Sequence, residues 1–163
     1  MATKKIIITQ LQYEKLLQVL IKKIKQSNFP VRQIVCIARG GLIPGAILSY
    51  TLKVPLAVIS VSSYPGDKIK QEQVLFSRDL TTAKPLLNKG VLVVDDLTES
   101  GLTLKETVHW LKWWYRIPAK EIRTVTVWHK ATCPTVPDFY AQLIKIDPRT
   151  KTCPWIVQPH ENF

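Results

Sequence analysis

The 163-residue chain lacks long hydrophobic runs, and its longest ones, such as residues 34–38 and 91–94, hold only a few apolar residues each. A membrane-spanning helix needs roughly 20 apolar residues, so we expect no membrane insertion. The basic N-terminus is not followed by an extended apolar segment, so the sequence shows no secretory signal. Both absences predict a cytoplasmic protein.

The chain is also poor in cysteine and histidine, with three of each. Cys36, Cys133 and Cys153 form no C-x-x-C pair and have no histidine at metal-ligand spacing. Such a scattered set predicts reduced thiols rather than a disulfide framework or a zinc site. A metal ion bound only by protein side chains is therefore not expected.

Acidic residues are scarce, since Asp and Glu total 12 against 23 Lys and Arg, which gives a formal net charge of +11. This surplus favours an anionic partner, either nucleic acid or a small phosphorylated molecule. It does not choose between the two, because the basic residues are spread along the chain. Hydrophobic residues make up 46% and charged residues 21%, which is typical of a folded protein, and the length predicts one domain, residues 1–163.

Helices and strands alternate along the chain. Thr9 and Gln12 form a capping box before apolar residues at helical spacing, which predicts a first helix ending near the lysines at 22–25. Further helices are expected from Pro44 to about Lys53 and after Leu102. Strands are expected at residues 34–38, 56–62, 91–95, 122–128 and 142–146. This order predicts an α/β fold with a mainly parallel central sheet flanked by helices.

Two polar motifs follow predicted strands, ARGG at 38–41 and DDLTESG at 95–101. In open α/β sheets, ligands bind at the carboxyl ends of the strands. The second motif has the ingredients of a phosphate site, because it combines hydroxyl groups and Gly101 with the expected start of a helix near Leu102. It is neither a G-x-x-x-x-G-K-[ST] loop nor a G-x-G-x-x-G fingerprint. Adjacent carboxylates can hydrogen-bond to a diol while the loop binds a phosphate nearby, and a ribose 5-phosphate carries both groups.

Three stretches carry a family resemblance. VLVVDDLTESGLT (91–103) resembles the phosphoribosyl pyrophosphate (PRPP) loop of type I phosphoribosyltransferases. IARGGLIPGAILSYTL and PWIVQPHE look like the pyrophosphate loop and the base-binding segment of the bacterial xanthine-guanine enzymes. The resemblance implies a type I phosphoribosyltransferase fold, with a small hood formed by roughly residues 131–163 and the first few residues, and a mobile loop at roughly 63–80. It also implies transfer of the 5-phosphoribosyl group from PRPP to N9 of a 6-oxopurine, with release of pyrophosphate, in purine salvage.

The resemblance also implies a role for individual residues. Arg39 and Gly40, through a non-prolyl cis peptide, and Lys70 would bind the pyrophosphate, and Glu99 would be the general base near purine N7. Mg²⁺ would be the cofactor, approached by Asp96. The 5-phosphate and ribose would contact the PRPP-loop residues, namely Asp95, Asp96, Leu97, Thr98, Glu99, Ser100, Gly101, Leu102 and Thr103. The base would contact Lys130 through O6, stack on Trp155 and meet the backbone of Ile156.

The sequence departs from the family pattern at a few of these positions. Glu99 stands where the family commonly has Asp, and Ser100 and Leu102 also differ from the usual residues. Val157 stands where the enteric-type enzyme has an acidic residue, which leaves the choice between xanthine and guanine open.

Two alternatives to this enzyme remain open. One is a regulatory protein that keeps the PRPP site and binds nucleic acid, and the other is a phosphoribosyltransferase for another heterocycle. A homodimer or homotetramer is expected. Trp110, Trp113 and Trp114, close together on one predicted helix, suit core or subunit-interface packing.

Overall fold

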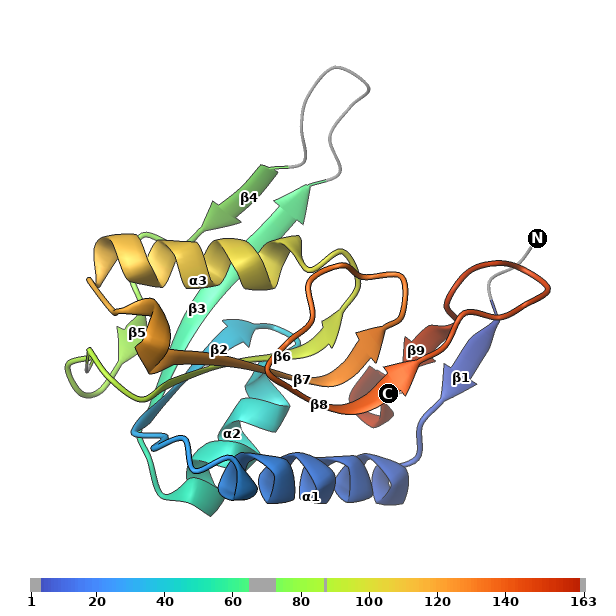
Figure 1. The fold of residues 1–163 in the computed structure, drawn as a ribbon, viewed down its shortest axis with the longest axis horizontal. Coiled ribbons are helices and arrows are strands. Elements are labelled where there is room, and N and C mark those ends of the chain that lie inside the picture. Colours follow the sequence, from blue (N-terminus) through green and yellow to red (C-terminus); the bar gives the residue numbers. More distant parts are fainter. Residues whose placement is uncertain (1–3, 65–72, 87, 162–163) are drawn as a thin grey trace.

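Within the described residues (4–64, 73–86 and 88–161 of a computed structural model), a seven-stranded sheet forms the centre of the molecule (Figure 1). Its main path runs β4-β3-β2-β6-β7-β8, and β5 pairs with β3. The neighbours along β3-β2-β6-β7-β8 are parallel, whereas β4 and β5 pair antiparallel with β3. The predicted mainly parallel α/β fold is therefore confirmed. The strands are β2 (Gln33–Ala38), β3 (Leu56–Tyr64), β4 (Gln73–Phe76), β5 (Thr81–Thr82), β6 (Val91–Thr98), β7 (Ile122–Lys130) and β8 (Phe139–Ile144).

Two strands extend further toward the polar motifs than the sequence pattern predicted. β6 continues through Thr98 instead of ending at residue 95, because its last residues pair in register with those of β7, Thr98 with His129. β7 extends to Lys130 because its last residues pair with those of β8, Lys130 with Ile144. β8 begins at Phe139 rather than at residue 142 and ends at Ile144. The acidic pair therefore lies within a strand and not after it.

Hydrophobic clusters cover both faces of the sheet, because successive side chains of a strand point to opposite sides. In β2, Ile34 belongs to one cluster and Val35 to the other. Helices α1 (Gln10–Gln26) and α2 (Leu42–Leu52) cover the first face, and α3 (Leu102–Trp114) covers the second (Figure 1).

The first helix begins as predicted. The Gln12 backbone N–H donates to the Thr9 hydroxyl (3.3 Å), and the Gln12 side-chain oxygen accepts from the Thr9 backbone N–H (2.8 Å). This capping box satisfies donors that have no partner within the helix. Four side chains at helical spacing then face the core, namely Tyr13, Leu17, Leu20 and Ile24.

Both ends of the segment predicted as a mobile loop at 63–80 contain strand residues. β3 continues to Tyr64, and β4 (Gln73–Phe76) returns alongside it with Ser62 opposite Leu75. Residues 65–72, the centre of the predicted loop, lie outside the described part of the chain. The sequence did not reveal β4 because a strand of four residues is too short to show a hydrophobic period.

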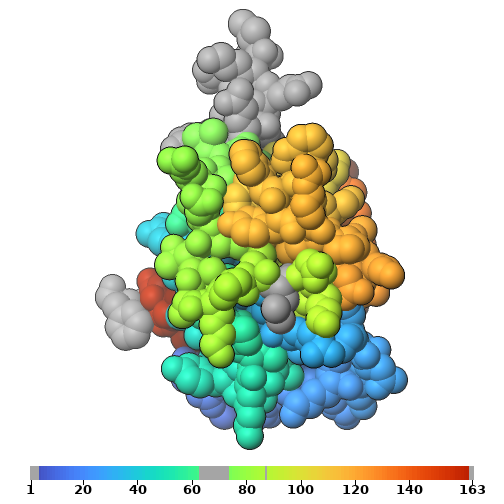
Figure 2. All heavy atoms as spheres, turned by 90° about the vertical axis from the view of Figure 1, so that its left-hand side faces the viewer, coloured from blue at the N-terminus to red at the C-terminus, as the bar shows by residue number. Residues whose placement is uncertain are grey.

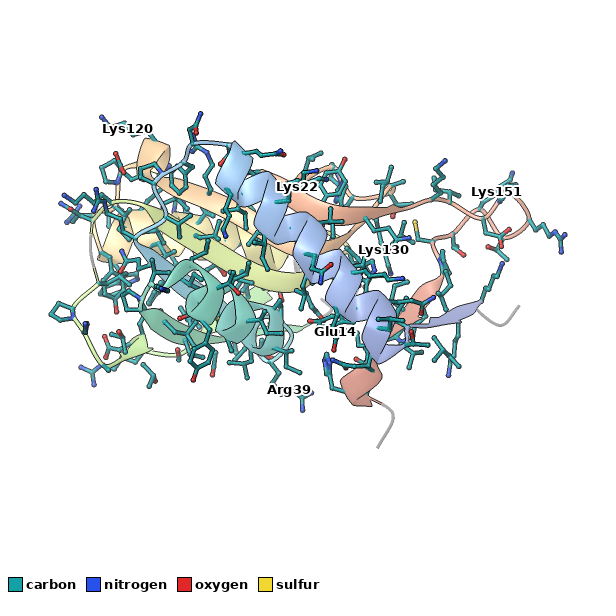
Figure 3. All side chains as sticks on the ribbon, turned by 90° about the horizontal axis from the view of Figure 1, so that it is seen from below. Glu14, Lys22, Arg39, Lys120, Lys130 and Lys151 are labelled. Carbon is teal, nitrogen blue, oxygen red and sulfur yellow. The ribbon has the colours of Figure 1, made fainter. Side chains whose placement is uncertain are left out.

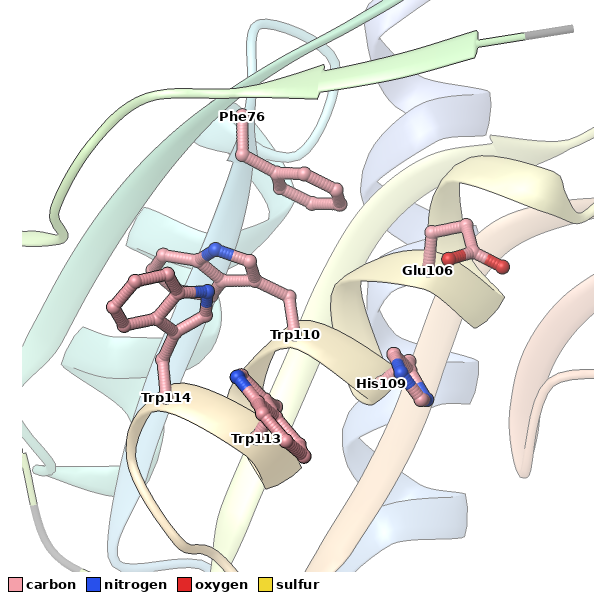
Figure 4. Close-up of a pocket in the computed structure, with 6 residues that line it drawn as sticks. All are labelled: Phe76, Glu106, His109, Trp110, Trp113 and Trp114. Atoms are coloured by element: carbon pink, nitrogen blue, oxygen red, sulfur yellow. The ribbon is translucent and has the colours of Figure 1, made fainter.

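The three tryptophans of α3 have different surroundings. Trp110 stacks on Phe76, with ring centroids 5.7 Å apart and planes 9° apart, and contacts Tyr115. Trp113 and Trp114 are exposed and line a groove with Trp110 and Phe76 (Figure 4). Seen from the end of the molecule in Figure 2, the last turns of α3 (orange) lie beside the segment that follows β4 (green). Trp110 is thus partly buried against Phe76 and Tyr115, whereas the other two are exposed.

A second sheet joins the two ends of the described chain. β1 (Lys5–Ile7) pairs parallel with β9 (Trp155–Val157), away from the main sheet (Figure 1). The pairing continues past both strands, since Ile8 N–H donates to Val157 O (2.9 Å) and Trp155 N–H to Lys4 O (2.8 Å). It brings together the two segments expected to form the hood. No helix in the described residues is long and apolar enough to cross a membrane.

Candidate functional site

The polar motifs meet at the edge of the sheet where β2, β6 and β7 have their carboxyl ends (Figure 1). Helices α2 and α3 both begin at this edge. Each has a glycine as N-cap, Gly41 or Gly101, and neither has an acidic residue in its first turn. Free N–H groups and the helix dipole at such ends favour an anion. The edge therefore offers two sites suited to phosphate groups.

The turn after β2 presents Arg39. The Ala38–Arg39 peptide is cis, in agreement with the non-prolyl cis peptide expected here. Gly41 N–H donates to Ile37 O (2.8 Å), which folds the turn back onto the strand. Arg39 is exposed and forms no ion pair with any described residue. Its guanidinium is thus available to an anionic ligand.

Asp95 and Asp96 lie side by side in β6 and are both partly buried. The Asp96 backbone N–H donates to Asp95 Oδ1 (2.9 Å). Burial, followed by the negative charge of Asp96, raises the pKa of Asp95 well above its usual range. Burial and the charge of Asp95 also raise the pKa of the Cys36 thiol to about 12, so this buried cysteine stays protonated.

Gly40 has no room for a side chain. A Cβ placed on it would collide with the carboxylate of Asp96. The turn after β2 and the acidic pair of β6 are therefore in direct contact, although 56 positions separate them in sequence (96 − 40). Glycine at this position allows the backbone to approach the carboxylate closely.

The loop between β6 and α3 departs from the sequence prediction at Thr98. Its side chain is buried, and its hydroxyl lies 2.9 Å from His129 Nδ1. Thr98 was expected to offer this hydroxyl to a phosphate, and that part of the prediction is wrong because the alternation of β6 turns the side chain inward. Leu97 likewise packs against the core. Both residues can serve a ligand only through their backbone.

The rest of that loop stays at the surface. Glu99 and Ser100 are exposed, and Leu102 and Thr103 are partly buried at the start of α3. Gly101 has a φ of +78°, a left-handed conformation that favours glycine. Ser100 Oγ accepts a hydrogen bond from Leu102 N–H (3.3 Å). The loop is thus a tight turn with hydroxyl groups and helix N–H groups close together.

Lys130 and Glu99 form an ion pair that the sequence did not reveal. Lys130 Nζ donates to Glu99 Oε1, and the lysine side chain is only 5% exposed against 61% for the glutamate. A buried ammonium group needs such a partner. The two residues are 31 positions apart, and the pairing of β6 with β7 brings them together. Neighbouring His129 is buried, and this burial lowers its pKa, so the imidazole is neutral at pH 7.

A cavity of about 350 Å³ adjoins this ion pair. The indole of Trp155 lines it, and Lys130 Nζ lies 5.8 Å from the centre of that ring. Ile156, the third residue expected at the base, is buried in the core and does not line this cavity. The sequence prediction named Glu99, Lys130 and Trp155 but missed the other lining residues, Thr132, Lys151, Thr152 and Cys153. No pattern in the sequence marks them, because they follow β7 and precede β9 in irregular segments.

Lys70, which was expected to bind the pyrophosphate, lies outside the described residues. Gln158, which was not predicted, donates from its side-chain amide to Asp96 Oδ2. The prediction therefore found the main polar groups of the edge but not the hydrogen bonds that join them.

The donor set fits Mg²⁺ delivered with a substrate better than a resident metal ion. The described residues contain no cluster of three or more His, Cys, Asp or Glu that could hold a metal ion. The acidic pair supplies only carboxylate oxygens, which are the ligands that Mg²⁺ prefers. Mg²⁺ commonly binds through one or two carboxylates, water and substrate phosphates, and Asp95 and Asp96 match that pattern.

Comparisons with known proteins agree with this geometry. A xanthine-guanine phosphoribosyltransferase of Gluconobacter oxydans is 37% identical over 89 residues, which are 54% of this chain and 52% of that protein. One from Idiomarina loihiensis is 32% identical over 88 residues, so the aligned part spans about half the length of these curated relatives. The structure of a purine phosphoribosyltransferase from Pyrococcus horikoshii has a TM-score of 0.77 and 31% identity, over 98% of this chain and 95% of that one. The phosphoribosyl transferase domain matches residues 6–161, and this chain therefore belongs to that family.

Proposed function

We propose that this protein transfers the 5-phosphoribosyl group from PRPP to N9 of a 6-oxopurine and releases pyrophosphate, as a purine salvage enzyme. The curated relatives that support this proposal are both xanthine-guanine phosphoribosyltransferases, and similar solved structures include purine phosphoribosyltransferases. The observation that carries it is the Lys130–Glu99 pair beside the Trp155 cavity.

This pair suits the edge of a 6-oxopurine. The purine presents the acceptor O6 next to N7, which carries a proton in the tautomer that attacks through N9. Lys130 has only donors, so it would bind O6, and the carboxylate of Glu99 would accept the proton from N7. A 6-amino group would instead point N–H donors at the ammonium group. The site is therefore expected to reject adenine, while the indole of Trp155 stacks on the ring.

The other end of the site suits PRPP. Arg39 would stabilise the negative charge that develops on the departing pyrophosphate, and preorganised charge of this kind is a large catalytic contribution. Asp95 and Asp96 would hold the ribose hydroxyls. The 5-phosphate would bind to the hydroxyls and N–H groups between Ser100 and Thr103, at the start of α3. A role of Lys70 at the pyrophosphate rests on the family resemblance alone.

Mg²⁺ is the cofactor of this proposal. Asp96 would approach it together with the oxygens of PRPP, and Mg²⁺ would help to neutralise the pyrophosphate charge.

The assembly and location are also part of the proposal. We propose a single phosphoribosyltransferase domain that forms a homo-oligomer. Along α2, Ile43, Ile47 and Tyr50 recur at helical spacing and are exposed, Tyr50 by 86%, although the helix is apolar on every side. Such a helix is usually buried, which supports a subunit contact. The three free, buried cysteines are in keeping with a cytoplasmic location.

No specific observation favours the nucleic-acid-binding alternative. Binding to nucleic acid would call for a continuous basic groove. In Figure 3, Lys22, Lys120 and Lys151 instead lie at well-separated parts of the molecule.

The experiment that tests the proposal is a measurement of nucleotide formation. The protein is incubated with PRPP and Mg²⁺ and with guanine, hypoxanthine, xanthine or adenine in separate reactions. Turnover of at least one 6-oxopurine and none of adenine is the expected result, and the order of kcat/KM values identifies the preferred base. Absence of turnover with all three 6-oxopurines would contradict the proposal. Retained binding of PRPP in that case would point to the regulatory alternative.

A further inference from the structure

Gln158 connects the base-binding segment to the acidic pair. It follows β9 directly, is only 5% exposed, and donates from Nε2 to Asp96 Oδ2 across 62 positions of sequence. Trp155, which lines the base cavity, belongs to the same short segment. A single hydrogen bond therefore links the part of the chain that meets the purine to the carboxylate expected at the ribose.

The carboxylate of Asp96 is a junction of three segments. It contacts Gln158 on one side, and on another it lies so close to Gly40 that a Cβ at that position would collide with it. Its position thus depends on the pyrophosphate turn, the PRPP loop and the base-binding segment at once. A group that fixes this carboxylate affects how all three parts fit a bound substrate.

The backbone of Gln158 is anchored by the turn that follows it. Its backbone N–H donates to Glu161 Oε2 (2.9 Å), and its backbone carbonyl accepts from Glu161 N–H (3.0 Å). The following turn also packs on α1, where the rings of His160 and Tyr13 lie 6.0 Å apart. The side chain of Gln158 thus starts from an anchored backbone, and it is buried, with its amide donating to Asp96.

The oxygen of the same amide lacks a partner. Gln158 Oε1 is buried and accepts no hydrogen bond from any described residue. A buried acceptor without a donor costs free energy, and such groups mark places where a ligand or water supplies the donor. A ribose hydroxyl is a donor of this kind, and Oε1 belongs to the amide that contacts Asp96.

From these contacts we propose that Gln158 positions Asp96 for the ribose of PRPP and couples PRPP binding to occupation of the base cavity. Stacking of a purine on Trp155 orders the segment that carries Gln158, so the amide then fixes the carboxylate more firmly. PRPP should in turn bind more tightly when the base cavity is filled, and the effect is reciprocal. This inference rests on the proposed function and assigns Gln158 a role as a positioning residue.

Gln158→Met tests the inference, because methionine has a similar length and no amide. Isothermal titration calorimetry gives the Kd of PRPP with Mg²⁺, alone and with saturating 9-deazaguanine, a purine analogue whose carbon at position 9 prevents turnover. The wild-type protein is expected to bind PRPP more tightly when the analogue is present. In Gln158→Met the Kd should rise at least about tenfold, as for loss of a hydrogen bond to a charged group, and should no longer respond to the analogue.

Two controls separate this role from a general loss of stability. Gln142→Met makes the same chemical change on β8, where the side-chain oxygen accepts from Trp128 Nε1 (3.3 Å), and should leave the PRPP affinity and its response to the analogue unchanged. Gln158→Glu keeps the length of the side chain but places a second carboxylate beside Asp96, so it should weaken PRPP binding more than Gln158→Met does. Melting temperatures of all variants are measured in parallel.

The outcomes are distinct. The inference is overturned if Gln158→Met binds PRPP as tightly as the wild-type protein, or if the wild-type affinity for PRPP does not respond to 9-deazaguanine. In either case, nucleotide formation by the wild-type protein leaves the proposed function intact. If the wild-type protein neither binds PRPP nor forms nucleotide, the proposed function itself fails and this inference falls with it.

Discussion

Replacing Glu99 by glutamine is the sharpest test of how the proposed chemistry works. The substitution keeps the length of the side chain and removes its ability to accept a proton. A positioned general base contributes about 10²- to 10⁴-fold to a rate. We therefore expect kcat for the preferred 6-oxopurine to fall by at least about 10²-fold in Glu99→Gln.

The same substitution should change stability only slightly. Lys130 is 5% exposed and loses its counter-charge, and breaking a fully buried ion pair costs about 3–5 kcal/mol. Glu99 is 61% exposed, however, so water already reaches the carboxylate, and the glutamine oxygen can still accept from the ammonium group. We expect a loss of about 1 kcal/mol, which lowers the melting temperature of a chain of this length by roughly 2–4 °C.

The assay compares steady-state kcat with thermal melting on the same preparations. Glu99→Asp is the matched variant, because it keeps the carboxylate but withdraws it by one methylene, and a displacement of about 1 Å can cost about 10²-fold. Its rate should lie between those of the wild-type protein and Glu99→Gln. Wild-type rates in both variants would refute the role of Glu99 as the base. A large fall in kcat that only mirrors the fraction of unfolded protein at the assay temperature would refute it equally.

Three further predictions concern other parts of the site. Asp95→Asn should be more stable than the wild-type protein at pH 8 and about equally stable at pH 3. The raised pKa of Asp95 means that the wild-type folded protein loses stability as the pH rises above the usual aspartate range, and asparagine removes this loss. An equal difference in melting temperature at both pH values would contradict this. Trp155→Ala should raise the KM for the purine by about 5- to 150-fold, because about 1–3 kcal/mol of stacking free energy is lost. The Kd of PRPP measured alone should change little. An unchanged purine KM would exclude stacking on this ring. Gly40→Ala should abolish measurable PRPP binding in calorimetry while the far-ultraviolet circular dichroism stays native, because its Cβ displaces the carboxylate of Asp96; retained affinity would show that this contact does not shape the PRPP site.

The sequence predicted the fold well because its regular elements have strong local patterns. The capping box at Thr9 and the helical spacing that follows it placed α1 correctly, and the apolar runs placed β2 and β6. These signals depend on residues a few positions apart, which a single sequence displays directly. Strands β4 and β5 have only four and two residues, which is too short for such a pattern, and the sequence predicts neither of them.

The sequence pointed to several of the polar residues that the structure brings together at this edge of the sheet, but not to the contacts between them. The acidic pair stands at the end of an apolar run, which drew attention to it, whereas Lys130 was expected at the site only through the family resemblance. Thr98 was misjudged because the strand continues through it, and only the register with His129 reveals that its hydroxyl faces inward. Gln158 carried no signal at all, since its partner lies 62 positions away.

Two long-range contacts hold polar groups of the candidate site within the fold. Lys130 pairs with Glu99, and Gln158 donates to Asp96, whereas Arg39 has no ion pair and Gln158 Oε1 no hydrogen bond with any described residue. Substrate binding then exchanges one set of partners for another, and the net gain in free energy depends on how well the ligand matches the geometry already held. Under the proposed function, a substrate with the wrong pattern of donors, such as a 6-aminopurine, would break these contacts without replacing them. The proposed selectivity therefore follows from the same hydrogen bonds that the protein already holds.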